Sequence, residues 1–223
     1  MNTSTRRPST SVALAKTRSV MVRDANNRYR DRMQVLVVHA HPNQDGFSRA
    51  LRDAAVRGLE TGGHSVDVLD LYEEGFVAAM SESERRAYES DTPIVDPQVQ
   101  RSADLLTAAD TVVFVYPTWW WGLPAILKGW LDRVLVPGVA FTLGDGRPKP
   151  GLTNVRRLEG ITTYGSSRIH SQFFNDAGRR TISRTLRMVC HKRTKVTWHP
   201  LYSIDATTDE QRSAFLAKVE RRL

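Results

Sequence analysis

The stretch Thr111-Val-Val-Phe-Val-Tyr-Pro-Thr-Trp-Trp-Trp-Gly-Leu-Pro-Ala-Ile-Leu-Lys-Gly-Trp-Leu-Asp-Arg133 joins a strand pattern, an aromatic loop and a helix pattern in one run. Residues 111–115 are β-branched or aromatic, which is the composition of a strand buried on both faces of a parallel sheet. Pro117 ends the strand, and Pro124 suits the first turn of a helix that continues to Arg133. In an open parallel sheet this loop lies at the carboxyl edge, where ligands bind, so its indole rings are expected to line a crevice.

The rest of the chain repeats the alternation of strand and helix. Strands are expected at 34–39, 65–70, 157–162 and 194–202, and helices at 47–59, 81–88, 96–109, 172–190 and 208–222. The Gly- and Pro-rich connection 136–155 is expected to be a turn-rich excursion and not a linker between domains. Five strands alternating with helices predict an α/β domain with a doubly wound, flavodoxin-like, five-stranded parallel sheet of order 2-1-3-4-5, in a three-layer αβα arrangement.

This strand order brings the loop after the first strand, 41–46, opposite the aromatic loop. The loop leads directly into a helix, whose first N–H groups and positive dipole end suit a phosphate. Gly46 allows a close approach, while Ser48 and His41 supply polar hydrogens. Because the loop has no P-loop signature, the alternative is that Ser48 only caps the helix and His41 is a solvated loop residue.

The aromatic loop contains the three consecutive tryptophans Trp119, Trp120 and Trp121, which cannot all face one core. At least one should line the crevice, where a planar tricyclic ring is a natural occupant because its faces stack on aromatic side chains. A dimer contact or an ordinary core cluster is the alternative. The loop 162–167 follows the next strand, and its backbone amides and hydroxyls suit the polar edge of such a ring.

The positive charge of the chain is concentrated at its start. Residues 1–32 hold eight Arg or Lys and two Asp, and so carry +6 of the formal net charge of +8. They are rich in Ser and Thr, so they are expected to form a disordered or loosely attached extension of a domain at 33–223. This location of the charge argues against a nucleic-acid partner. A transit peptide for an organelle, or a true start at Met21 or Met33, is an alternative explanation.

Composition also limits the cellular setting. No apolar run reaches the roughly 20 residues that cross a bilayer, so a soluble, cytoplasmic protein without an integral membrane segment is expected. The single cysteine, Cys190, excludes an internal disulfide and is expected to be a buried thiol. His39 and His41 are a candidate metal pair, but no acidic or cysteine partner stands at ligand spacing nearby, so no metal is expected.

Four segments together resemble the NAD(P)H:quinone oxidoreductase family, also called the flavodoxin-2 family: 116–133, His39-Ala-His-Pro42, Gly46-Phe-Ser48 and Thr162-Thr-Tyr-Gly165. The resemblance covers about residues 34–222. It implies a homodimer with tightly bound FAD or FMN that transfers two electrons from NADH or NADPH to quinones or similar flat acceptors in a ping-pong cycle. Matching positions imply that the phosphate end of the flavin lies against His41, Gly46, Phe47 and Ser48. They imply that the isoalloxazine lies against Pro117, Thr118, Trp119, Trp120, Trp121, Gly122, Thr162, Thr163, Tyr164 and Gly165.

Two positions concern proton transfer. The family's third loop usually has two glycines after its threonines, and here Tyr164 replaces the first of them, which places its ring or hydroxyl near the flavin. Better-known members have a downstream tyrosine and histidine as a proton relay, and His170 is the nearby histidine of this chain. Tyr164 and His170 are therefore the candidate catalytic residues, with a surface role as the alternative for His170.

Three further alternatives stay open. A regulatory flavoprotein that docks on a membrane transporter, with only ancillary reductase activity, would share these loops. Azo-dye reduction would be the same chemistry with another acceptor. The basic residues between Arg179 and Arg193 form either a solvated helix face or a contact for the 2′-phosphate of NADPH.

Overall fold

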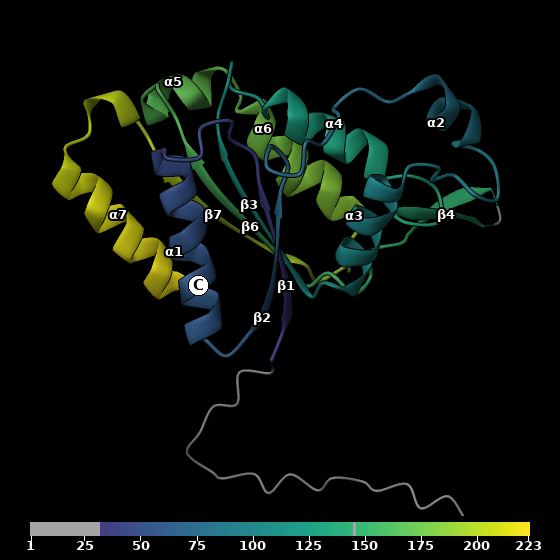
Figure 1. Ribbon diagram of the computed structural model, residues 1–223. Helices are drawn as coiled ribbons and strands as arrows, with labels where there is room; N and C mark the ends of the chain where they lie inside the picture. Colours follow the sequence, from purple (N-terminus) through teal and green to yellow (C-terminus); the bar gives the residue numbers. More distant parts are fainter. Residues whose placement is uncertain (1–31, 145) are drawn as a thin grey trace, which may run out of the picture.

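The computed structural model, which describes residues 32–144 and 146–223, is built around a parallel sheet of five strands. The strands are ordered β2-β1-β3-β6-β7, with bounds β1 Gln34–His39, β2 Ser65–Asp70, β3 Thr111–Pro117, β6 Arg157–Thr163 and β7 Lys195–Leu201 (Figure 1). Counted within the sheet, this is the order 2-1-3-4-5, and all neighbouring strands are parallel. The predicted fold class is confirmed.

Helices cover both faces of the sheet (Figure 1). α1 and α7 pack on one face, against a cluster that includes Val35 and Val113, while α3 and α4 pack on the other, against a cluster that includes Leu36 and Phe114. Because consecutive residues of β1 and β3 enter opposite clusters, the central residues 35–38 and 112–115 are all apolar. The helices are α1 Phe47–Thr61, α2 Glu82–Ala87, α3 Pro97–Ala108, α4 Ala125–Val134, α5 Arg168–Phe173, α6 Ala177–Arg180 and α7 Asp209–Arg222.

A buried ion-pair network fixes α4, the helix that follows the aromatic loop. The Arg133 side chain is only 3% exposed, and it donates hydrogen bonds to Glu84 Oε1 and Asp96 Oδ2, each at 2.7 Å. Glu84 belongs to α2 and Asp96 caps α3, so one guanidinium joins three helices. Burial alone would raise the pKa of both carboxyls, but their hydrogen bonds outweigh it and lower the pKa of each below its usual value.

The predicted helix over 172–190 is wrong, because the chain breaks within it. Asn175 and Asp176 are left-handed, with φ of 70° and 39°, and separate α5 from α6. α6 then continues directly into a π-helix, η1 (Thr181–Leu186). The break is stabilised from outside the segment, since the Asp176 carboxylate accepts a hydrogen bond of 2.7 Å from the hydroxyl of Tyr164.

The excursion 136–155 contains a small antiparallel hairpin formed by β4 (Phe141–Gly144) and β5 (Arg147–Pro150). The sequence did not predict it, because two of the four residues of β5 are prolines, which are depleted in strands. After the hairpin the chain returns to the end of η1, where Leu152 bridges to Cys190. The Cys190 thiol is buried, as predicted, and donates to a backbone carbonyl of η1 at 3.3 Å.

Among the described residues, no helix is both long and apolar enough to cross a membrane. The predicted basic extension, 1–32, lies outside the described residues except for Arg32.

Candidate active site

Three loops meet at the carboxyl edge of the sheet, as the strand order requires. The ring of His41 lies 6.4 Å, centroid to centroid, from the ring of Trp119, so the first and second loops face each other. Thr118 joins the second loop to β6, because its N–H donates to Thr163 O at 2.8 Å and its hydroxyl lies 2.9 Å from that of Thr162. The loops are 40–46 after β1, 118–124 after β3 and 164–167 after β6.

The tryptophan loop is a tight turn with backbone strain. Trp119 and Gly122 exchange two backbone hydrogen bonds, of 3.3 and 2.9 Å, so only Trp120 and Trp121 form the tip. Both tip residues are left-handed, with φ of 49° and 54°. This conformation is uncommon for bulky side chains and costs roughly 1–2 kcal/mol at each residue other than glycine. Strain of this kind concentrates at functional sites.

The two tip tryptophans differ in how firmly they are held. The Trp121 ring stacks on Phe174 at 4.0 Å between centroids, and its Nε1–H donates to Ser166 Oγ at 3.1 Å. Its carbonyl accepts a hydrogen bond of 3.0 Å from the N–H of Gly178, in α6. The Trp120 side chain, by contrast, is 93% exposed. Trp121 is therefore a fixed wall of the site, while Trp120 is free to contact a ligand or a second molecule.

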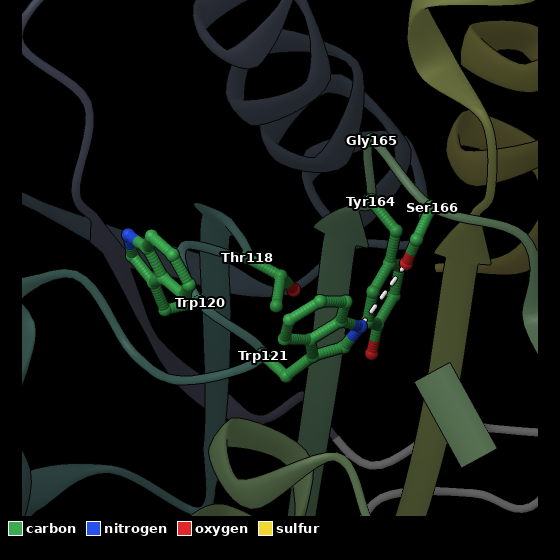
Figure 2. Close-up of a pocket in the computed structure, with 6 residues that line it drawn as sticks. All are labelled: Thr118, Trp120, Trp121, Tyr164, Gly165 and Ser166. Carbon is green, nitrogen blue, oxygen red and sulfur yellow. Dashed lines mark hydrogen bonds between the residues drawn. The ribbon is translucent and has the colours of Figure 1, made fainter. Parts of the chain in front are cut away.

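A pocket of about 280 Å³ opens between the tryptophan turn and the third loop, lined by Thr118, Trp120, Trp121, Tyr164, Gly165 and Ser166. Figure 2 shows the Trp121 and Tyr164 rings on one side of the pocket and Trp120 on the far side of Thr118. All of these except Ser166 were predicted to bind the cofactor. Pro117 ends β3 beneath the pocket, and Thr162 and Thr163 are buried in β6. The walls combine flat apolar faces with hydroxyls, which suits a planar ring that has a polar edge.

The hydroxyl of Tyr164 is directed into the protein. The side chain is 1% exposed, and its hydroxyl donates to Asp176 Oδ2 at 2.7 Å and accepts from Trp198 Nε1 at 3.2 Å. Burial, together with the bond to Asp176, raises the pKa of Tyr164 well above its usual value. The Tyr164 ring therefore contributes to the pocket wall, while its hydroxyl proton stays in the hydrogen bond to Asp176, away from the pocket. The predicted catalytic role of Tyr164 stays a prediction.

His170 lies on the exposed surface of α5, outside the residues that line the pocket. Its Nδ1 is 3.0 Å from the hydroxyl of Ser167, the residue that caps α5. This bond orients the ring and leaves Nε2 toward solvent or a bound molecule. Its proposed function as a proton donor also stays a prediction.

The start of α1 lacks a side-chain cap. Gly46 is the N-cap in an extended conformation, and no acidic residue lies in the first turn. The alternative in which Ser48 caps the helix is therefore wrong. Phe47 begins the helix, and His41 accepts a hydrogen bond of 3.0 Å from the N–H of Asn43. These residues do not line the tryptophan pocket. They form a separate part of the same sheet edge, where helix N–H groups remain available for an anion.

A buried network that the sequence patterns did not predict lies beneath this helix start. His39 is fully buried, with Nδ1 2.6 Å from Asp70 Oδ2 and Nε2 3.1 Å from Ser48 Oγ. Arg52 of α1 donates to the same Asp70 oxygen at 2.9 Å. Burial would raise the pKa of Asp70, but hydrogen bonds from His39 and the Glu73 backbone, with the charge of Arg52, lower it to about 2. The signal was available, because the predicted strands 34–39 and 65–70, aligned in register, pair His39 with Asp70.

Comparisons with known proteins agree with this geometry. Residues 33–223 match the model of the flavodoxin-2 family, described as a flavodoxin-like fold. NAD(P)H dehydrogenase [quinone] 1 of Rattus norvegicus is 35% identical over 153 residues, or 62% of this chain and 56% of the relative. An uncharacterized NAD(P)H oxidoreductase of Haemophilus influenzae is 35% identical over 136 residues, or 60% of this chain and 66% of the relative. The chain thus spans less than two thirds of these curated relatives. The solved NAD(P)H:quinone oxidoreductase from Methanothermobacter marburgensis superposes with a TM-score of 0.70 at 26% identity, covering 85% of this chain and 94% of that one.

Proposed function

The chain belongs to the flavodoxin-2 family, and on this premise we propose that it is a flavin-dependent NAD(P)H oxidoreductase. In this proposal, two electrons pass as a hydride from NADH or NADPH, through tightly bound FAD or FMN, to a quinone or a similar flat acceptor. The observation that carries it is the aromatic pocket between the tryptophan turn and the third loop, at the carboxyl edge of the sheet and next to the switch point between β1 and β3. The relatives include NAD(P)H:quinone oxidoreductases, which supports the same chemistry.

The described residues suit both ends of a flavin. The uncapped start of α1 at Gly46 offers N–H groups and a positive dipole end to a phosphate. The Trp121 ring offers a flat wall, and the hydroxyls of Thr118 and Ser166 with the backbone of Gly165 suit the polar edge of the ring. When bound there, the flavin supplies the group that accepts and returns a hydride.

The protein's own contribution is orientation, charge stabilisation and proton supply. The Trp121 side chain is fixed by Phe174 and Ser166, so it holds a stacked ring in one position. In this proposal, backbone amides of the third loop, of which that of Tyr164 already donates to Leu201 O, stabilise negative charge at the pocket. We assign proton donation to His170 in preference to Tyr164, because the His170 ring is exposed and held at Nδ1 by Ser167, which leaves Nε2 to exchange a proton with a bound molecule. The Tyr164 proton, by contrast, is held by Asp176 and its pKa is raised.

We also propose a homodimer that covers the pocket. Large apolar side chains are exposed beside it, with Trp120 at 93%, Phe173 at 80% and Ile169 at 78%. Exposed apolar side chains of this size, grouped around a pocket, are typical of an interaction surface. A cytoplasmic location is the matching expectation for a chain whose one cysteine is a free, buried thiol.

The deciding experiment is to purify the protein, record its visible spectrum and identify the released cofactor. We expect a yellow protein whose flavin bleaches anaerobically with NADH or NADPH and recolours with a quinone. A colourless protein that binds neither FAD nor FMN would overturn the proposal. A yellow protein that neither nicotinamide bleaches would instead favour the alternative, a regulatory flavoprotein that docks on a membrane transporter.

A further inference from the structure

The helical segment after the left-handed break is strongly basic. Residues 177–195, which include α6 and η1, contain no Asp or Glu. Their basic side chains are Arg179, Arg180, Arg184, Arg187, Lys192, Arg193 and Lys195. A stretch of this composition creates a positive potential that attracts anions from solution.

The cations of this segment have no carboxylate partner among the described residues. Several exposed arginines elsewhere do lie beside carboxylates, as Arg49 does with Glu73 at 2.5 Å. Among residues 32–144 and 146–223, no carboxylate lies within 4.0 Å of the charged groups of Arg184, Arg187 or Lys192. Their charge is therefore not neutralised within the described part of the chain.

The unpaired cations line two adjoining hollows. One, of about 510 Å³, is lined by Arg184, Arg187 and Lys192 together with the hydroxyl residue Ser183. The other, of about 370 Å³, is lined by Arg180 and again by Arg184. Because Arg184 lines both, we treat them as one basic groove, defined by Arg180, Arg184, Arg187 and Lys192. Its size is that of a site for a small molecule.

One hydrogen bond and one lowered pKa indicate that the groove is preorganised for negative charge. Arg187 donates from Nε to Thr194 O at 3.0 Å, which fixes the guanidinium and leaves its two terminal nitrogens available. His191 also lines the groove, and partial removal from water and the charges of Arg156 and the two basic residues after it lower its pKa. The groove thus disfavours further positive charge on its own wall.

We propose that the basic groove is a binding site for a small phosphorylated anion, distinct from the tryptophan pocket. Arginine forks bind phosphate oxygens in pairs, and the four cations of the groove suit the charge of a ligand with two phosphate groups. Two kinds of molecule carry such phosphate groups. One is the phosphate end of NADPH, because Asn175 and Ala177, which line the groove, follow Phe174 in the chain, and Phe174 stacks on Trp121 at the pocket. A free nucleotide or oligophosphate is the other source.

The test measures binding of 2′,5′-ADP, ADP and pyrophosphate to the full-length protein by isothermal titration calorimetry at physiological salt. We expect saturable binding of at least one probe, with Kd raised about tenfold by Arg184→Gln and similarly by Arg187→Gln. Arg221→Gln is the matched control, because it removes the same charge from an exposed position on α7 and should leave Kd unchanged. Thermal melting of each variant checks that the fold is intact.

Competition then separates the sources. If NADPH displaces the probe, and if Arg184→Gln raises KM for NADPH but not for NADH, the ligand of the groove is NADPH. This part of the test alone rests on the proposed function. Probe binding that NADPH does not displace identifies a free phosphorylated ligand. Absence of saturable binding, an equal loss in Arg184→Gln and Arg221→Gln, or binding only to vesicles of anionic lipid would overturn the proposal. Because calorimetry needs no bound flavin, a protein that lacks flavin leaves this test intact.

Discussion

The tryptophan turn and the Arg133 network are close in sequence but opposite in physical character. The Arg133 side chain is 3% exposed and ion-paired on two sides, whereas the Trp120 side chain is 93% exposed and its backbone is strained. The first region holds α4 against α2 and α3, and the second presents aromatic rings from the turn that precedes the same helix. The difference indicates that stability is concentrated behind the site, so that the turn can keep a conformation suited to binding.

The largest effect should come from breaking the network. Arg133→Ala leaves the carboxylates of Glu84 and Asp96 without their partner, and Glu84 is only 6% exposed. Because a buried charge without a partner is costly, we expect the free energy of unfolding in urea to fall by about 3–5 kcal/mol. Arg85→Ala, at an exposed position of α2, should change it by less than about 0.5 kcal/mol. Equal losses of unfolding free energy in Arg133→Ala and Arg85→Ala would show that the buried ion pairs contribute no more than the exposed one.

An intermediate effect is expected at the network of His39, Asp70 and Arg52, which is buried like Arg133 but lies under the site. Folding lowers the pKa of Asp70 from 3.8 to about 2, so its contribution to stability is complete above pH 3.8 and is lost as the pH falls through about 2. This contribution amounts to about 2 kcal/mol. The stability gap between the wild-type protein and Asp70→Asn should therefore narrow between about pH 5 and pH 2 in denaturant titrations.

The control for this pH dependence is Asp45→Asn, which changes an exposed aspartate in the loop before α1. Its stability should follow that of the wild-type protein across the same range. A gap for Asp70→Asn that stays constant as the pH falls would contradict the proposed ionised state of Asp70.

The smallest effect on stability is expected at Trp120, and its sign is informative. Trp120→Gly removes the energetic cost of a bulky residue in the left-handed conformation. Because the Trp120 side chain is exposed, the substitution loses no buried surface, so the free energy of unfolding should rise by up to about 1 kcal/mol. Trp120→Ala keeps that cost and should be nearly neutral. Both variants should weaken flavin or acceptor binding, measured by fluorescence titration. Loss of stability in both, without weaker binding, would mean that the turn is structural and that the comparison with Arg133 fails.

The fold was predictable because its signals are local. Residues 35–38 and 112–115 are apolar at every consecutive position, as expected of a strand buried on both faces, and Gly62 and Pro124 mark helix boundaries. The aromatic loop could likewise be placed at a ligand edge, because the position of a loop follows from the order of the strands.

The errors occurred where distant contacts decide the structure. The break at Asn175 and Asp176 is held by the hydroxyl of Tyr164, a residue on another loop, so periodicity within 172–190 could not reveal it. His39 appeared to be an ordinary strand end until the pairing of β1 with β2 placed Asp70 beside it. Sequence patterns thus located the edge of the sheet that carries the site, but not the hydrogen bonds that fix its side chains.

The single cysteine, Cys190, makes local opening of the fold measurable by thiol labelling. Its thiol is 2% exposed, burial raises its pKa to about 12, and it lies where the excursion returns to η1. A thiol in this state does not react with alkylating reagents, so any labelling must follow a transient opening of that contact. With one cysteine in the chain, the labelling rate reports a single event, and its dependence on denaturant distinguishes local opening from global unfolding.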